Sequence, residues 1–497
     1  MCPTRAGGRP IFLDTRSVCW DNGQTIRHKD RIRRESMSTE QISDQAYISG
    51  LVGKSREAFA EFQVFTQKQV DAILRDIAKD VFDSARELAE MAVKETGMGG
   101  VEYKVKKNEG KARILWYSLK GKPSMGVISE DEESGITEIA KPMGVVAAVQ
   151  PTTNPTVTPM ANCMAALKGK NTIIIAPHPR AENTTKYSVN NWRDILVKHG
   201  APKDVIQLVE DGSVERTKEL MQQCDVNVAT GGPAMVRSAY SSGHPSYGVG
   251  QGNVQTIIDR DVDIAETVKM ILDARIFDNG IICSGEQTMI TPEEKWDELR
   301  AAVREYGGYW VDDGAEKQKF TDVLFPGGKI NKEMVGQTVA SIAAAAGVEV
   351  PADAKVIVIP EDAANKDSLL RKEKMFPVIT PFKYKEFSDA VDIAVENLMR
   401  EGKGHSVSVH SHNDAHLKEL GLRAPVSRVL VNQPCATANG GAFTNSLNAT
   451  STLGAGTWGN NSISENFYYR HLLNITRIAK VKKHSHQPSD DEIWSLE

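Results

Sequence analysis

The sequence of 497 residues lacks the features of several large classes of protein. It has no run of 18 apolar residues, so no segment is long enough to cross a membrane as a helix. Its six cysteines stand far apart, at positions 2, 19, 163, 224, 283 and 435, and include no Cys-x-x-Cys pair. Neither a disulfide framework nor a zinc knuckle is expected. The 60 basic and 65 acidic side chains leave a net charge of −5, too balanced to make nucleic acid or an anionic membrane the expected partner.

The composition is that of a globular protein with sizeable cores. Hydrophobic residues make up 40% of the chain and charged residues 25%, with 39 glycines and 21 prolines, which excludes disorder over most of the sequence. At roughly 150 residues per domain, the length predicts about three structural units, or two large ones. A small-molecule function is the first expectation, and unpaired thiols fit the reducing cytoplasm.

The first 36 residues differ from the rest of the chain. They hold eight basic and four acidic side chains, so they carry about +4 and the remainder about −9. They lack the apolar stretch of a secretory signal, and their acidic residues do not suit a transit peptide. We expect either a disordered tail or an upstream reading of the true start at Met37, which is followed by a sequence typical of the start of a helix.

Apolar periodicity divides the body of the chain. Residues 40–120 show the three- and four-residue spacing of packing helices. Residues 127–140 have apolar ends around an acidic turn with a glycine, a pattern typical of a protruding β-hairpin that pairs with a neighbouring subunit. Four buried-type strands at 144–149, 172–176, 205–209 and 226–229 are separated by helix-length gaps, which predicts a doubly wound parallel sheet. Strand candidates at 288–290, 355–359, 406–409 and 428–431, with helices at 293–305 and 386–400, predict a second α/β domain.

Three short motifs stand where such a fold binds ligands. The motif TGGP, from Thr230, follows the fourth strand, where the N–H groups of a helix could cradle a pyrophosphate; a simple tight turn is the alternative. Asn154, in the motif PTTNP, follows the first strand and could donate to an oxyanion, or mark a turn only. Cys283 lies among small residues that leave its sulfur approachable, although most lone cysteines only pack.

Together these motifs resemble a family. The segments FDNGIICSGEQ around Cys283, PTTNP, APHPRA, ATGGP, KMFPV preceded by Glu373, and GTWGNNSISEN with HLLN are similar, in the same order, to the CoA-acylating branch of the aldehyde dehydrogenase superfamily. The likeness runs from about residue 45 to 480. It implies an α/β fold with a doubly wound cofactor domain (37–124 and 144–253), a catalytic domain (254–456) and an oligomerisation arm (125–143 and 467–485), whose last strand would join the arm of a partner subunit.

The resemblance also implies the chemistry. The catalytic residues would be Cys283 as nucleophile, Asn154 with the Cys283 backbone N–H as oxyanion donors, and His405 as a base with a pKa near neutrality. NAD or NADP would be the cofactor, with coenzyme A as co-substrate and no metal; His410, His412 and His416 are expected in a solvated loop. The residues expected to bind the cofactor are Thr153, Pro177, His178, Arg180, Thr230, Gly231, Gly232, Gly250 and Glu373.

One sequence difference from the wider family bears on whether the product is a free acid or an acyl-CoA. Hydrolytic members carry a water-activating glutamate before a Gly-Gly pair, whereas residues 247–253 contain no carboxylate. The sequence therefore predicts an acyl-CoA product from a cysteine thioester, because a thiol needs less activation than water. A hydrolytic enzyme that makes the free acid, and a scaffold or filament subunit with secondary catalysis, are the alternatives.

The aldehyde is less closely defined. A short-chain C2-type aldehyde, either acetaldehyde or sulfoacetaldehyde, is expected as substrate. Residues 467–470 are Phe-Tyr-Tyr-Arg, where relatives that act on acetaldehyde often have Gly-Pro-Lys; the change is either structural or accommodates an anionic group. A homodimer or homotetramer is expected, in the cytoplasm or inside a protein microcompartment.

Overall fold

Four helices form over residues 44–119, where apolar residues recur at intervals of three and four. The computed structural model describes residues 43–496, and the expectations for residues 1–36 lie outside this range. In the second of these helices, Ile73, Leu74, Ile77 and Val81 are fully buried, as their spacing predicts. The helices are α2 (Asp44–Phe62), α3 (Gln67–Asp83), α4 (Ala85–Thr96) and α5 (Val101–Leu119).

A five-stranded parallel sheet confirms the doubly wound architecture. Its strands lie in the order β5-β4-β3-β6-β7, and every neighbouring pair is parallel. Val146 and Ala148 face one core while Val145, Ala147 and Val149 face another, because alternate side chains of a strand point to opposite faces. The strands are β3 (Val145–Val149), β4 (Thr172–Ala176), β5 (Ile206–Leu208), β6 (Val226–Thr230) and β7 (Ser246–Val249). The sequence did not predict β7, which is short and contains Ser, Tyr and Gly.

Helices cover both faces of this first sheet. The helices α3, α6 (Val157–Lys168) and α7 (Glu182–Lys198) pack on one face, and α2 and α8 (Val214–Gln223) pack on the other. The strand order reverses at β3, which has β4 on one side and β6 on the other. Open parallel sheets bind ligands beyond the carboxyl ends of their strands at such a switch point. The residues that follow β3 and β6 therefore flank the expected crevice.

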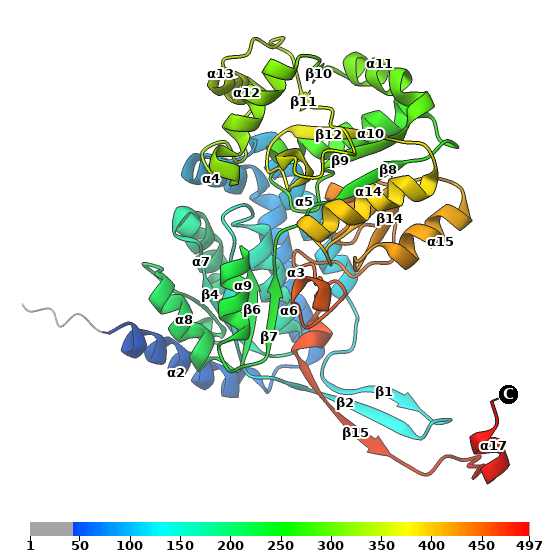
Figure 1. Ribbon diagram of the computed structural model, residues 1–497. Helices are drawn as coiled ribbons and strands as arrows, with labels where there is room; N and C mark the ends of the chain where they lie inside the picture. Colours follow the sequence, from blue (N-terminus) through cyan, green and yellow to red (C-terminus); the bar gives the residue numbers. More distant parts are fainter. Residues whose placement is uncertain (1–42, 497) are drawn as a thin grey trace, which may run out of the picture. The chain divides into compact units, whose positions relative to one another are not determined.

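The second sheet is also parallel throughout. Its order is β10-β11-β12-β9-β8-β13-β14, and Figure 1 shows α14 and α15 in front of it. The strands are β8 (Gln255–Ile258), β9 (Thr288–Pro292), β10 (Gly308–Trp310), β11 (Val356–Val358), β12 (Val378–Tyr384), β13 (Val407–His410) and β14 (Val429–Val431). The predicted strands became β9, β11, β13 and β14. Polar residues or proline interrupt the apolar pattern of β8 and β12, and β10 has only three residues, so these three strands were missed.

The second sheet has its own helical layers. The helices α10 and α11 pack on one face, α14 and α15 pack on the other, and α12 and α13 pack beside β11. Their bounds are α10 (Ile264–Ile276), α11 (Trp296–Tyr306), α12 (Gly314–Leu324), α13 (Val339–Ala346), α14 (Phe387–Arg400) and α15 (Asp414–Arg423). The two helices predicted at 293–305 and 386–400 are α11 and α14. Among residues 43–496, no helix combines the length and apolar content needed to span a membrane.

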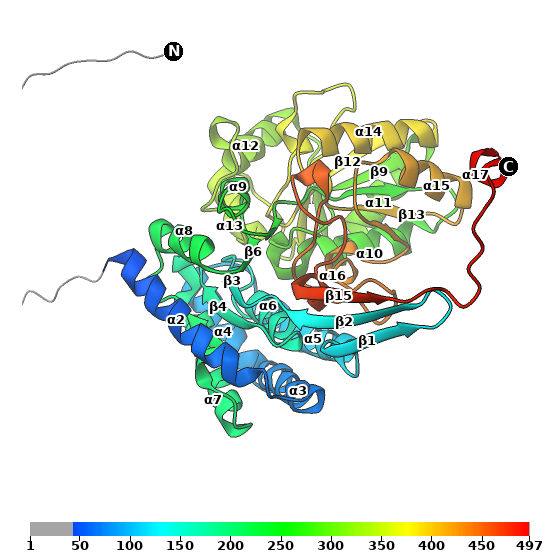
Figure 2. The ribbon, with the colours of Figure 1, turned by 90° about the horizontal axis from the view of Figure 1, so that it is seen from below.

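A three-stranded antiparallel arm extends from the body (Figures 1 and 2). The predicted hairpin is β1 (Gly126–Asp131) with β2 (Ile136–Pro142). The third strand, β15 (Leu473–Ala479), pairs along the whole of β2 in the same chain. Its expected place in the arm of a partner subunit is therefore wrong, because the backbone groups of β2 are already satisfied within the chain.

Asn171 joins this arm to the first sheet. Its Oδ1 accepts hydrogen bonds from the N–H groups of Met143 (2.7 Å) and Gly144 (3.0 Å), between β2 and β3. Its Nδ2 donates to the carbonyl oxygens of Ala166 (3.2 Å) and Leu472 (2.9 Å). One fully buried side chain thus joins the end of β2 and the start of β15 to the amino ends of β3 and β4.

Replacing Asn171 should loosen this junction. We expect Asn171→Ala to lower the free energy of unfolding by about 3 kcal/mol, because buried backbone groups that lose their partners cost about 1–3 kcal/mol each. Urea unfolding followed by circular dichroism measures the change. The exposed Asn474, with one bond of 3.2 Å to the carbonyl oxygen of Pro142, provides the control: Asn474→Ala should cost less than about 0.5 kcal/mol. Equal losses in the two variants would contradict the role of Asn171.

Candidate active site

Segments from both parallel sheets contribute to the candidate active site. Asn154 follows β3 of the first sheet, and Thr230 is the last residue of β6. In the second sheet, Cys283 lies between α10 and β9, Glu373 precedes β12 and His405 precedes β13. The carboxyl edge of one sheet and the amino edge of the other therefore supply the predicted residues.

The backbone before Cys283 has an unusual conformation. Asp278, Asn279 and Gly280 all have left-handed dihedrals, with φ of 52°, 52° and 76°, which is rare for residues other than glycine. The fully buried Arg275 holds this turn by donating to the carbonyl oxygen of Gly280 and to two carbonyl oxygens of the segment before β12. Cys283, three residues on, is partly exposed as a residue, although its thiol group is buried.

Two lysines of α5 neutralise Asp278 and connect it to Asn154. Asp278 is fully buried, and its Oδ2 pairs with Nζ of Lys104 at 3.0 Å and with Nζ of Lys107. Although burial raises the pKa of Asp278, the two lysines bring that pKa below its ordinary value. Nζ of Lys107 also donates to Oδ1 of Asn154 at 2.7 Å, and Nδ2 of Asn154 donates to Oγ1 of Thr153 at 3.2 Å. The amide oxygen of Asn154 is thus occupied, and its second N–H stays available.

Gly252 brings Cys283, Glu373 and His405 to one place. A Cβ on Gly252 would overlap the carbonyl oxygen of Cys283 and lie 3.4 Å from Cε1 of His405, so the close approach requires a glycine. The N–H of Gly252 donates to Oε1 of Glu373 at 3.1 Å. Three of the residues predicted from separate motifs are therefore neighbours.

Burial sets the protonation of this cluster. Burial, followed by the charge of Glu373, raises the pKa of Cys283 to about 12, while Arg428 and the backbone N–H groups of Cys283 and Ser284 oppose the rise. Burial and the neighbouring Glu401 raise the pKa of Glu373 to about 8. At neutral pH the thiol is protonated, and so is most of the Glu373 population.

His405 differs from the expectation of an ordinary pKa. Its side chain is 1% exposed, and neither ring nitrogen has a hydrogen-bond partner among the described residues. Burial, with the charge of Arg428, lowers its pKa to about 3. The imidazole is therefore neutral at physiological pH, and it can accept a proton only where a negative charge develops beside it.

The crevice beyond β6 has the features of a dinucleotide site. Oγ1 of Thr230 is buried without a hydrogen-bond partner among the described residues. Gly232 is the N-cap of helix α9 (Pro233–Tyr240) and provides no side-chain cap, and a Cβ on Gly232 or Gly250 would meet open space. Uncapped N–H groups and a hydroxyl without a partner suit a pyrophosphate and its ribose. Gly231 is held to β7 by its N–H, which donates to the carbonyl oxygen of Val249 at 3.1 Å.

The residues expected at the adenosine end lie apart from Cys283. Pro177 and His178 follow β4, and Nδ1 of His178 accepts from the N–H of Arg180 at 3.1 Å. The exposed Arg180 donates to the carbonyl oxygen of Thr96 at 3.2 Å. None of these contacts involves the cluster around Cys283.

Several charged residues of the site were missed in the sequence. One face of α5 carries the buried Lys104 and Lys107 and the partly exposed Lys111, and the buried Arg428 donates to the carbonyl oxygen of His405 at 2.8 Å. The spacing of the lysines, at i, i+3 and i+7, places them on one helical face. The sequence could have indicated this cluster. A helix face that combines lysines with apolar residues differs from an ordinary solvent-exposed face, where charged residues stand without apolar neighbours.

Other sequence motifs serve packing in this structure. The hydroxyl groups of Tyr468 and Tyr469 donate to backbone carbonyl oxygens, and both rings belong to the core beneath the first sheet. The structural reading of residues 467–470 is therefore favoured over an anion site. His416 bonds Asp259 at 2.6 Å and stacks on Phe387. Within residues 43–496, no group of three or more His, Cys, Asp or Glu is arranged to hold a metal ion.

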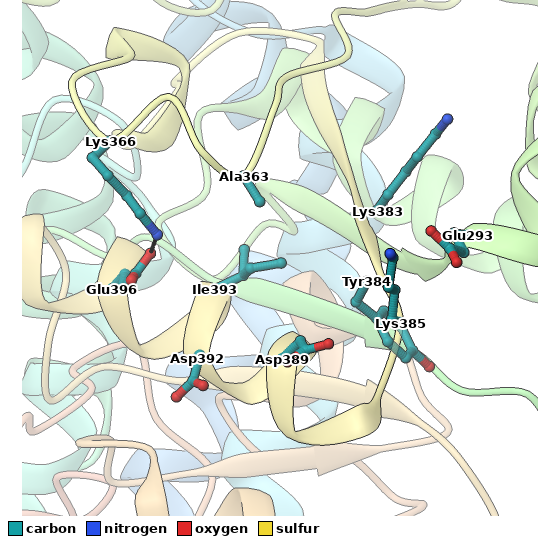
Figure 3. Close-up of a pocket in the computed structure, with 10 residues that line it drawn as sticks. All are labelled: Glu293, Ala363, Lys366, Lys383, Tyr384, Lys385, Asp389, Asp392, Ile393 and Glu396. Atoms are coloured by element: carbon teal, nitrogen blue, oxygen red, sulfur yellow. Dashed lines mark hydrogen bonds and ion pairs between the residues drawn. The ribbon is translucent and has the colours of Figure 1, made fainter.

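A surface hollow of about 460 Å³ lies away from Cys283, between the end of β12 and α14. Figure 3 shows that its lining mixes lysines with acidic side chains and that Lys366 reaches Glu396. Because both signs of charge line it and two of those charges already pair, the hollow indicates no single ligand class.

The chain is similar to known proteins over most of its length. Residues 20–444 match the sequence model of the aldehyde dehydrogenase family. The chain is 46% identical to a succinate-semialdehyde dehydrogenase (acetylating) of Clostridium kluyveri, over 91% of this chain and 100% of that protein. It is 37% identical to a sulfoacetaldehyde dehydrogenase of Acholeplasma sp, over 90% and 93% of the two chains. An acetylating aldehyde dehydrogenase from Geobacillus thermoglucosidasius has a TM-score of 0.85 at 34% identity, with 90% and 98% of the chains covered.

The protonation of Cys283 can be measured directly. Because its pKa is raised to about 12, the rate at which iodoacetamide alkylates Cys283 should rise about tenfold per pH unit between pH 7 and 10 without levelling. At pH 10, where Glu373 is ionised, Glu373→Gln removes a negative charge beside the thiol and should speed alkylation several-fold. Peptide mass spectrometry separates Cys283 from the other cysteines, and the exposed Glu294→Gln is the control. A rate that levels near pH 8, or slows in Glu373→Gln, would contradict this electrostatic description.

Proposed function

Because this chain belongs to the aldehyde dehydrogenase family and to its CoA-acylating branch, we propose that it oxidises a short-chain aldehyde to an acyl-CoA with NAD or NADP. The observation that carries the proposal is a partly exposed Cys283 that meets Glu373 and His405 at Gly252, with Asn154 tied to the Cys283 loop through Lys107 and with no carboxylate in residues 247–253. The thiol provides a nucleophile, and the absent carboxylate leaves no dedicated activator of water in that segment.

Asn154 and the backbone stabilise the first intermediate in this proposal. The sulfur of Cys283 adds to the aldehyde carbon, and the carbonyl oxygen takes the negative charge. Because Lys107 occupies Oδ1 of Asn154, the amide can present only its Nδ2 to that oxygen. The N–H of Cys283 is the second donor. Donors fixed before the reaction stabilise the developing charge without reorganisation.

The proton of Cys283 passes to a neighbour as the carbon–sulfur bond forms. His405 has a free ring nitrogen but a pKa of about 3, whereas Glu373 has a pKa of about 8. We therefore keep His405 as the base only for the addition step, in which the negative charge that develops on the aldehyde oxygen raises the proton affinity of the imidazole. Most of the Glu373 population is protonated at neutral pH, so Glu373 is kept as the ribose ligand and not as the base.

The cofactor is proposed to lie along the first sheet. Thr230, Gly231 and Gly232 would hold the pyrophosphate, Thr153 and Gly250 would flank the dinucleotide near the nicotinamide, and Glu373 would bond its ribose. Pro177, His178 and Arg180 would meet the adenosine end, where the guanidinium suits the extra phosphate of NADP. When bound, the nicotinamide accepts the hydride of the aldehyde carbon, which leaves an acyl thioester on Cys283.

Coenzyme A is proposed to release the acyl group. Its thiol attacks the thioester, the bond to Cys283 breaks, and the thiolate of Cys283 takes up a proton again. Hydrolysis to the free acid remains the second candidate, because Glu373 is a carboxylate near the sulfur; its hydrogen bond to Gly252 argues that it holds a ligand instead.

The substrate is proposed to be an aldehyde of two to four carbons. Acetaldehyde and sulfoacetaldehyde were expected from the sequence. The relatives named above act on sulfoacetaldehyde and succinate semialdehyde by their names, so succinate semialdehyde joins the candidates. Two of these three aldehydes carry a negative charge.

We also propose that the chain works as a homodimer or homotetramer in the cytoplasm. The outer strand of the arm, β1, has an unpaired edge in this chain, and Val127 on it is 54% exposed. Such an edge can pair with another chain. A reducing compartment would preserve the thiols of Cys163, Cys224, Cys283 and Cys435, none of which is in a disulfide.

The reaction can be tested by omitting coenzyme A. Reduction of NAD or NADP with each candidate aldehyde should depend on coenzyme A, and the product should be the acyl-CoA. Cys283→Ala should lose more than about 1,000-fold in rate, whereas Cys163→Ala, a buried cysteine of α6, should stay within about threefold. Turnover to free acid at a comparable rate without coenzyme A would overturn the proposal, and so would a loss below tenfold in Cys283→Ala, about 1.4 kcal/mol of barrier.

Lys107 is expected to act through Asn154. Lys104→Met and Lys107→Met each remove one partner of Asp278, but only the second frees the amide oxygen of Asn154. We expect Lys107→Met to lower kcat for hydride transfer about 10- to 100-fold more than Lys104→Met does, since one oxyanion donor contributes about 10²–10³. In an Asn154→Ala background the extra loss should disappear. Pre-steady-state reduction of the nicotinamide measures it, and equal effects in the two backgrounds would exclude this role.

A further inference from the structure

Lys111 differs from Lys104 and Lys107, the two buried lysines of α5. Lys104 and Lys107 share the carboxylate of Asp278. Lys111 lies one helical turn after Lys107, and among residues 43–496 no carboxylate forms an ion pair with it. The helix therefore carries three lysines on one face, and Asp278 of the Cys283 loop neutralises only the first two of them.

The contacts of Lys111 fix its position without neutralising its charge. Nζ donates to the carbonyl oxygens of Gly440 (3.0 Å) and Thr450 (3.1 Å). A Cβ on Gly440 would lie 2.6 Å from this Nζ, so the glycine makes room for the ammonium. Two of its three N–H groups have protein partners, and the side chain is partly exposed. One donor is left for a ligand.

The surroundings of Lys111 make its charge costly. Burial lowers its pKa to about 8, and the charged groups that act on it are Cys283, which raises the pKa, and Lys107, which lowers it. A buried cation without a carboxylate is unfavourable unless an anion completes the site. An anion that accepts the remaining N–H of Lys111 would offset this cost.

The geometry limits the length of that group. Lys107 and Lys111 are four residues apart, roughly 6 Å along the helix. Nζ of Lys107 lies 2.7 Å from the amide oxygen of Asn154, whose N–H is proposed to hold the aldehyde oxygen. A carboxylate that is three carbon–carbon bonds from the aldehyde carbon is about 4 Å away from it, and its oxygen atoms extend further. A short ω-anionic aldehyde can therefore reach both donors.

We propose that Lys111 binds the negatively charged end of the aldehyde, so that the enzyme prefers aldehydes whose carboxylate or sulfonate is separated from the carbonyl carbon by one or two carbons to uncharged aldehydes of the same size. This inference rests on the proposed function, and it adds the chemical class of the substrate. The ammonium donates its third N–H to the anion, and the two carbonyl oxygens keep the lysine in place when the site is empty. A different role, in which Lys111 only favours the thiolate of Cys283, predicts equal effects on all aldehydes.

Steady-state kinetics with paired substrates separates these roles. Lys111→Met should lower kcat/KM for succinate semialdehyde at least 30-fold and for sulfoacetaldehyde at least tenfold, while kcat/KM for butyraldehyde stays within threefold. Lys111→Arg keeps the charge and should retain most of the preference. Lys106→Met removes an exposed lysine of the same helix and should change neither substrate more than twofold. Equal losses for charged and uncharged aldehydes in Lys111→Met would overturn the proposal.

A second measurement does not depend on turnover. Iodoacetate and iodoacetamide are of similar size, but only iodoacetate is an anion. The ratio of their alkylation rates at Cys283 should fall about tenfold in Lys111→Met and stay unchanged in Lys106→Met. An unchanged ratio in Lys111→Met would overturn the proposal, even if the kinetics were disturbed for other reasons. Failure of the wild-type enzyme to make any acyl-CoA would sink the proposed function instead, and this ratio would still decide the role of Lys111.

Discussion

The buried carboxylate of Asp278 is the constraint on which the site depends. A charge with no exposure must be neutralised. Here both partners come from α5, a helix that packs on α3, α4 and α6 beside the first sheet, while Asp278 belongs to the loop of Cys283 in the second. The same Lys107 holds the amide of Asn154. One ion pair thus positions nucleophile and oxyanion donor relative to each other, although they are carried by different sheets.

The balance of charge around Cys283 follows from this arrangement. Lys104, Lys107, Lys111 and Arg428 are near the sulfur or its loop, while Glu373 has a pKa raised to about 8. The whole chain is acidic, with a net charge of −5, yet its candidate site is locally cationic. Coenzyme A, the dinucleotide and the oxyanion are all negative, so the local field matters more than the total.

Much of the fold could be predicted because its signals are local. Strands such as β3 and β4 are buried on both faces and read as continuous apolar runs, and Cys283, Asn154 and Glu373 stand in recognisable motifs. β7, β8 and β12 were missed because serine, threonine, glycine or proline breaks their pattern. The Lys107–Asp278 pair was out of reach because its members are 171 residues apart. The low pKa of His405 comes from tertiary burial, which no local pattern records.

The pairing of β15 with β2 determines when the arm can fold during synthesis of the chain. The two strands of the hairpin leave the ribosome more than 300 residues before the strand that completes their sheet, since Leu473 pairs with Pro142. During that interval β2 has an open edge, and such edges invite pairing with other chains. Contacts this distant in sequence form slowly. The acidic turn of the hairpin and its short strands are then useful during synthesis, because like charges keep nascent copies from joining edge to edge.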